Sequence, residues 1–63
     1  MTYTITLPNV TREGAVVVEQ QLRGLNGVEY VDIDVPSETA TVTATLTYAE
    51  VLDAIRQSGI PAN

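Results

Sequence analysis

The fold of this chain is decided between Leu7 and Val31, where the sequence reads LPNVTREGAVVVEQQLRGLNGVEYV. The stretch predicts a strand end, a polar loop, an amphipathic helix that stops at Gly27, and the start of a second strand. The helix is predicted because apolar residues recur at intervals of three, four and three between residues 15 and 25, which places them on one stripe. The stripe consists of Ala15, Val18, Leu22 and Leu25.

Strands are predicted wherever apolar and polar residues alternate with period two. These segments run from Thr2 to Leu7, from Val28 to Val35 and from Ala40 to Leu46. The turn Pro36-Ser37-Glu38 separates the last two segments, so they are expected to form a hairpin. In each strand, one set of alternate side chains is expected to face the core.

Both helices carry further local signals. The second is predicted to begin at the capping box Thr47-Tyr48-Ala49-Glu50 and to end at Gly59. On the first, Glu19 and Arg23 are spaced for an ion pair, and the valine pair 16–17 lies outside the stripe and is expected to be partly exposed. The expected buried stripe of the second helix is Tyr48, Val51, Leu52 and Ile55.

The element order is strand, helix, strand, strand, helix, with room for a short fourth strand after Ile60. Right-handed connections then give one ferredoxin-like domain over residues 1–63, an α+β sandwich with two helices on one face of an antiparallel sheet. The other face of the sheet is expected to be open. It is predicted to carry Thr2, Thr4, Thr6, Tyr30, Asp32, Asp34, Thr41, Thr43 and Thr45.

Composition narrows the classes of function. The 63 residues include no cysteine and no histidine, the usual ligands of zinc and of soft metals. Three arginines and no lysine stand against eight carboxylates, which argues against nucleic-acid binding. Glu29, Asp32, Asp34 and Glu38 form an acidic run with no basic residue among them. The lysine-free, acidic and threonine-rich composition resembles that of proteins from salt-loving organisms. With no membrane-length apolar run and no recognisable leader, a cytoplasmic protein is expected.

Several core and turn positions occur in the order and at the spacing of a known family. They are Val18, Leu22, Leu25-x-Gly27-Val28, Val31-x-Ile33-Asp34, Ala40-x-Val42 and Leu52-x-Ala54-Ile55 before Gly59-Ile60. In this set the chain resembles the heavy-metal-associated domain, found in copper chaperones, mercuric-ion carriers and metal-transporting ATPases. The resemblance covers nearly the whole chain and implies a ferredoxin-like fold and an origin in metal trafficking.

The sequence departs from this family in the loop before the first helix. The family motif is Cys-x-x-Cys, whose thiolates bind soft metal ions. Without a gap, the two thiol positions fall on Thr11 and Gly14, whereas a one-residue shift selects Arg12 and Ala15. Neither pair offers a soft ligand, so we expect no bound metal and no cofactor, and we assign no metal-binding or catalytic residue.

Two surfaces are candidate sites. The loop at the family's metal-site position is a candidate ligand or partner site, because it offers oxygens, donors and one cation at a helix N-terminus. It comprises Asn9, Val10, Thr11, Arg12, Glu13 and Gly14. The alternative is a polar connector in which Thr11 caps the helix. Tyr30, Asp32 and Asp34 form a candidate docking face, although the aspartates alone supply too few ligands for Ca²⁺ or Mg²⁺.

These observations favour a small, non-enzymatic binding or regulatory module that acts through protein contacts, either with a partner that has a basic surface or as a homodimer. One alternative is a metal-handling protein whose ligands come from a partner or a second subunit. Another is a small-ligand sensor of the ACT type, although the Asp-x-x-Gly opening of such domains is missing. An acylphosphatase-like enzyme would use Arg12, but the glycine-rich phosphate loop is missing as well.

Overall fold

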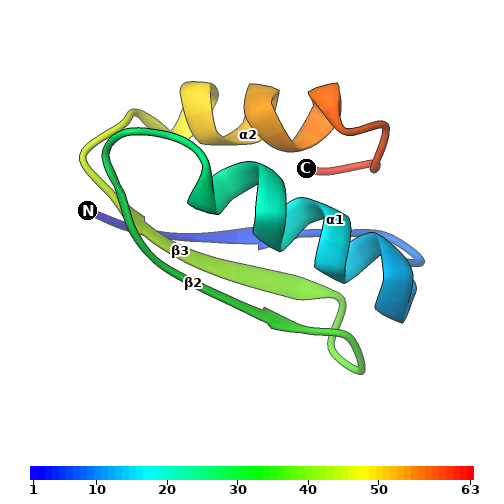
Figure 1. Ribbon diagram of the computed structural model, residues 1–63. Helices are drawn as coiled ribbons and strands as arrows, with labels where there is room; N and C mark the ends of the chain where they lie inside the picture. Colours follow the sequence, from blue (N-terminus) through cyan, green and yellow to red (C-terminus); the bar gives the residue numbers. More distant parts are fainter.

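Both helices pack on one face of a three-stranded antiparallel sheet, which gives the protein two layers (Figure 1). The computed structural model describes residues 1–63. Its elements are β1 (Thr2–Thr6), α1 (Arg12–Arg23), β2 (Val28–Asp34), β3 (Thr39–Ala44) and α2 (Tyr48–Gln57). The strand order is β1-β3-β2, which confirms the predicted ferredoxin-like α+β arrangement. Neither helix combines the length and the apolar character needed to cross a membrane.

The predicted short fourth strand is represented by one residue beside β1. The backbone N–H of Asn63 donates to the Thr6 carbonyl at 2.9 Å, and the Thr6 N–H donates to the Asn63 carbonyl at 3.3 Å. The preceding residue is held by Arg56, whose Nε and Nη2 donate to the Ala62 carbonyl at 3.2 and 3.0 Å. The C-terminal segment therefore lies along β1, where the ferredoxin-like topology places a fourth strand.

The core lies between the sheet and the helices and contains no buried polar side chain. The inward positions of all three predicted strands contribute to it, which confirms the period-two assignments. Burial of these apolar side chains is the main favourable term in folding. The core cluster consists of Ile5, Leu7, Val18, Leu22, Val31, Ala40, Val42, Ala44, Val51, Ala54, Ile55 and Ala62.

The boundaries of α1 differ from those that the apolar spacing predicts. The helix starts at residue 12 because the Thr11 side chain accepts the N–H of Gly14 at 3.0 Å, and it ends before Gly24, which forms the C-cap. Leu25 lies beyond the helix and packs partly buried against the core. Gly27, with φ of 100°, serves the turn into β2, so its predicted role as the helix stop is wrong.

Two finer predictions for α1 are confirmed. Val16 and Val17 are 51% and 44% exposed, because the buried stripe lies on the other side of the helix. Glu19 Oε1 and Arg23 Nη2 lie 3.3 Å apart in the expected ion pair. Since the Arg23 and Glu19 side chains are 64% and 43% exposed to solvent, the pair contributes only about a few tenths of a kcal/mol to stability.

The capping box at the start of α2 is confirmed. The Glu50 N–H donates to Thr47 Oγ1 at 3.2 Å, and Glu50 Oε1 accepts the Thr47 N–H at 2.9 Å and the Thr47 hydroxyl at 3.0 Å. The hydrogen bond from the Thr47 backbone N–H lowers the pKa of the Glu50 carboxyl below its usual value, and the bond from the Thr47 hydroxyl lowers it further. These reciprocal bonds satisfy donors that a helix N-terminus otherwise leaves free.

The predicted burial of Tyr48 is wrong. The residue is 40% exposed, and its ring packs edge-on against the ring of Tyr3, with 5.6 Å between the centroids. The Tyr3 hydroxyl in turn donates to the Leu46 carbonyl at 2.7 Å. Tyr48 is the first residue of α2 and pairs with the start of β1, while Ala54 is buried with Val51 on the stripe facing the core.

Candidate functional site

The loop between β1 and α1 is supported by the turn between β2 and β3. The Leu7 N–H donates to the Glu38 carbonyl at 2.7 Å, and the Asn9 N–H donates to Glu38 Oε1 at 2.8 Å. Asn9 and Glu38 both have φ of 58°, in the left-handed region that non-glycine residues seldom adopt. Glu38 therefore supports the candidate loop, whereas the sequence places it in a free acidic run. No local signal in the sequence indicates this contact.

Thr11 and Gly14, the pair that an ungapped reading assigns to the thiol motif, lie close together at the start of α1. Thr11 Oγ1 accepts the Gly14 N–H, so Thr11 caps the helix. This cap is the one predicted by the alternative in which the loop is only a polar connector. Gly14 is buried, and a Cβ built on it lies 3.3 Å from Thr11 Oγ1 and 3.2 Å from Cδ1 of Ile60. Side chains at positions 11 and 14 thus share one small space beside the C-terminal segment. That space contains a hydroxyl and no thiolate.

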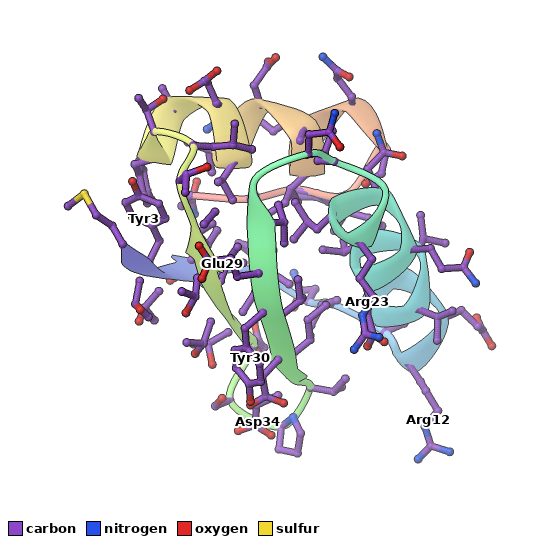
Figure 2. The ribbon with its side chains drawn as sticks, turned by 60° about the vertical axis from the view of Figure 1, so that its left-hand side comes forward. Tyr3, Arg12, Arg23, Glu29, Tyr30 and Asp34 are labelled. Carbon is purple, nitrogen blue, oxygen red and sulfur yellow. The ribbon has the colours of Figure 1, made fainter.

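The remaining loop residues are divided between solvent and core. Asn9, Arg12 and Glu13 are exposed, and Val10 packs partly buried against the core. Figure 2 shows Arg12 directed away from the body of the protein. Its guanidinium forms no ion pair, since the pair within α1 is the one salt bridge of the molecule. No group of three or more carboxylates lies close enough together to hold a metal ion.

The open face of the sheet is a regular array of three rows across the strands. In register, the rows are Thr2–Thr43–Tyr30, Thr4–Thr41–Asp32 and Thr6–Thr39–Asp34. Thr39 belongs to this face although the sequence-based strand begins one residue later, whereas Thr45 lies beyond the end of β3. The alternation of threonine with apolar residues that places Thr41 on the open face also places Thr39 there. All three residues of the candidate docking face come from β2, and Tyr30 is 56% exposed.

Acidic side chains collect along the edge strand β2. Glu29, Asp32 and Asp34 are exposed, and the basic residue beside this edge, Arg23, is already paired with Glu19 (Figure 2). Asp34 Oδ2 accepts the Ser37 hydroxyl at 2.6 Å. An open hollow of about 200 Å³ lies at the same edge and is lined by Arg23, Val28, Glu29, Tyr30 and Val31. The edge therefore combines unpaired negative charge with a partly apolar hollow.

Comparison with known proteins identifies the fold. No protein-family model and no curated protein matches the sequence. Oxidized MerP from Ralstonia metallidurans CH34 is 21% identical with a TM-score of 0.89, over 100% of this chain and 93% of that chain. The copper(I)-loaded first domain of the human copper chaperone for SOD1 is 23% identical with a TM-score of 0.89, over 97% and 86%. The N-terminal domain of PacS from Synechocystis PCC6803 is 22% identical with a TM-score of 0.88, over 100% and 94%.

At these identities the likeness establishes the fold alone. The chain has the ferredoxin-like fold of heavy-metal-associated domains, over nearly its whole length. The proteins with this fold include domains described as binding copper.

Proposed function

We propose that this chain is a heavy-metal-associated domain that has lost its thiol metal site and works in the cytoplasm as a non-enzymatic binding or regulatory module, through contacts with another protein. One observation carries the proposal: the two thiol positions hold a threonine and a glycine. Thr11 already uses its hydroxyl to cap α1, and Gly14 has no side chain. The fold is kept while the ligands that a soft metal requires are missing.

The one sulfur atom of the chain does not replace the thiols. It belongs to Met1, which is 82% exposed and precedes β1, whereas the candidate loop follows β1 at its other end. A single thioether supplies one neutral soft ligand, whereas the family motif supplies two thiolates. Metal handling by this chain would therefore need ligands from a partner or from a second subunit.

The hollows of the molecule favour a contact role over a small-ligand sensor. None of them is lined by a residue of the loop from Asn9 to Gly14. Ligand sites are usually concave and surround most of the ligand surface. The open sheet face, with Asp32 and Asp34 free of basic neighbours, is better suited to a protein whose surface is basic.

The loss of the metal site is tested on the full chain. Native mass spectrometry after growth in copper and zinc, together with competition against a chromogenic Cu(I) chelator, is expected to show no tightly held metal. One equivalent held by the monomer would overturn the proposal. One equivalent held only by a dimer or a complex would support the alternative with shared ligands.

The contact role is tested by photo-crosslinking in the source cells. A photoreactive amino acid in place of Tyr30, on the open face, is expected to capture a partner protein. The matched control places it at Gln57, an exposed residue of α2 on the opposite layer. Equal capture at the two positions, or none at Tyr30, would contradict the proposed contact surface.

A further inference from the structure

We infer that the free edge of β2 is a site of strand addition, and that it accepts an extended protein segment in which basic residues alternate with apolar ones. The inference rests on the proposed contact function and specifies the chemistry of the partner. In strand addition, unpaired backbone groups supply affinity and alternate side chains supply specificity. β2 has both the unpaired backbone groups and the alternating side chains that strand addition requires.

The hydrogen-bond pattern of the sheet identifies the unpaired backbone groups. Met1 and Ala44 exchange two backbone bonds of 2.8 Å, so the even-numbered residues of β3 pair toward β1. Because the direction of bonding alternates along a strand, the odd-numbered residues pair toward β2. Their partners in register are Tyr30, Asp32 and Asp34. Val31 and Ile33, which lie between these partners, therefore direct their N–H and C=O groups away from the sheet.

An added strand places its side chains by the same alternation. Its residues that bond to Val31 and Ile33 project on the helix side of the sheet. The residues between them project on the open face and lie closest to Tyr30, Asp32 and Asp34, with Cα atoms about 4.5 Å apart. Lysine or arginine at these positions meets two carboxylates that have no basic neighbour, and the exposed ring of Tyr30.

The helix side of the edge favours apolar residues. Val31 is 6% exposed, and Ile33 is partly buried and packed against the core. The hollow of about 200 Å³ at this edge is lined by Val28 and Val31 but also by the charged residues Arg23 and Glu29, so the preference for apolar residues rests on Val31 and Ile33 themselves. The two sides of the edge thus select an alternation of basic and apolar residues.

A second copy of β2 is a poor occupant of this edge. Pairing two β2 edges brings Asp32 and Asp34 against the same carboxylates of the neighbouring molecule, and like charges placed opposite each other destabilise a strand pair. Charge on an edge strand is a common means of preventing such self-association. The negative charge of Asp32 and Asp34 therefore disfavours pairing with a second β2 edge and favours pairing with a strand that carries basic residues.

The test uses the full chain and an end-blocked, fluorescein-labelled peptide, Lys-Val-Lys-Val-Lys-Val-Lys, whose binding is followed by anisotropy at low ionic strength. N-methylation of its valine amides removes the donors that face β2, whereas N-methylation of its lysine amides removes donors that face away. The first change is expected to weaken binding about tenfold, as for two lost hydrogen bonds, and the second to leave it unchanged. Amide exchange at Val31 and Ile33 is expected to slow on binding, while Asp32 is protected beforehand.

Charge alone is controlled by a peptide of four lysines followed by three valines. Equal binding of the two peptides, or equal effects of the two methylations, would overturn strand addition and leave the proposed contact function standing. Absence of binding, or a peptide-free dimer with Val31 and Ile33 protected, would also overturn it.

Asp32→Asn is expected to weaken binding and Asp53→Asn, on α2, to leave it unchanged. Failed crosslinking at Tyr30 with normal peptide binding would overturn only the proposed function.

Discussion

The backbone N–H of Asn9 donates to the side-chain carboxylate of Glu38 at 2.8 Å, across 29 residues of sequence. Both residues adopt φ of 58°. The Glu38 carbonyl also accepts the N–H of Leu7, so one turn residue fixes the end of β1 and the loop that follows it. The position of the candidate loop therefore depends on the β2–β3 hairpin.

Replacing Glu38 is expected to release this loop. Glu38→Ala removes the acceptor, whereas Glu38→Gln keeps an oxygen in place, and both meet the same left-handed backbone. The alanine variant is expected to be less stable than the glutamine variant by about 1 kcal/mol, as for one hydrogen bond. Its Asn9 amide is expected to exchange faster, as measured by NMR. Equal exchange in the two variants would show that the bond does not hold the loop.

The spacing of apolar residues predicts most of the fold, because burial of apolar side chains determines which side of each helix and strand faces the core. The alternating strands and the stripe of Val18 and Leu22 place one side of each element against a common core, and the helix caps at Thr11 and Thr47 are local signals. The support of the loop by Glu38 was missed because it joins distant turns with no local pattern. Tyr48 was misassigned because spacing cannot show that the first turn of α2 meets Tyr3.

The candidate site was less predictable than the fold. An ungapped reading of the loop placed the thiol positions at Thr11 and Gly14, and these positions do share one space. The assignment of the loop and of the β2 residues as binding surfaces stays a prediction. The free edge of β2 could not be read from the sequence, because strand order depends on long-range pairing.

The melting temperature is expected to rise between dilute buffer and molar potassium chloride. Glu29, Asp32 and Asp34 lie exposed on one strand without basic partners, and their repulsion is screened when the Debye length falls to about 3 Å. Circular dichroism measures the transition. A variant with Asp32→Asn and Asp34→Asn is expected to show a smaller rise. A flat or falling curve for the parent chain would remove the argument for adaptation to salt.

Thr47→Ala is expected to lower the free energy of unfolding by about 1 kcal/mol. The substitution removes the oxygen that accepts the Glu50 N–H and opens the capping box. Thr47→Ser keeps the hydroxyl and is the matched control. Urea denaturation of the three proteins measures the difference. Parent-like stability of the alanine variant would mean that the cap contributes nothing to α2.

Stability is also expected to depend on the ionisation of Glu50. Its pKa is lowered in the folded chain by the backbone and hydroxyl bonds from Thr47, so the unfolded chain binds the proton more readily. The contribution is therefore fully present above the ordinary glutamate pKa of about 4.3 and is lost as the pH falls through the lowered folded value. The stability advantage over Glu50→Gln is expected to shrink from about pH 6 to about pH 3 in urea denaturation. A difference independent of pH would contradict this linkage.

A metal site is expected to return when the thiol pair is restored. Thr11→Cys with Gly14→Cys places two thiols in one space, since a Cβ at position 14 lies 3.3 Å from the oxygen of Thr11. Gly14 is not in the left-handed region, so the obstacle is Ile60 Cδ1 at 3.2 Å. Adding Ile60→Val removes that methyl group. The triple variant is expected to hold one equivalent of Cu(I) in competition with a chromogenic chelator.

The control for this site is the shifted pair, Arg12→Cys with Ala15→Cys. Arg12 is exposed and directed away from the protein (Figure 2), whereas Ala15 is 9% exposed on the buried side of α1. A thiol at position 15 would be enclosed beside the core while its partner at position 12 lies in solvent, so this pair is expected to bind Cu(I) more weakly. It is also expected to destabilise the chain more, because a sulfur replaces a hydrogen beside the core. Equal binding by both pairs, or none by the first, would show that positions 11 and 14 do not correspond to the family's metal site.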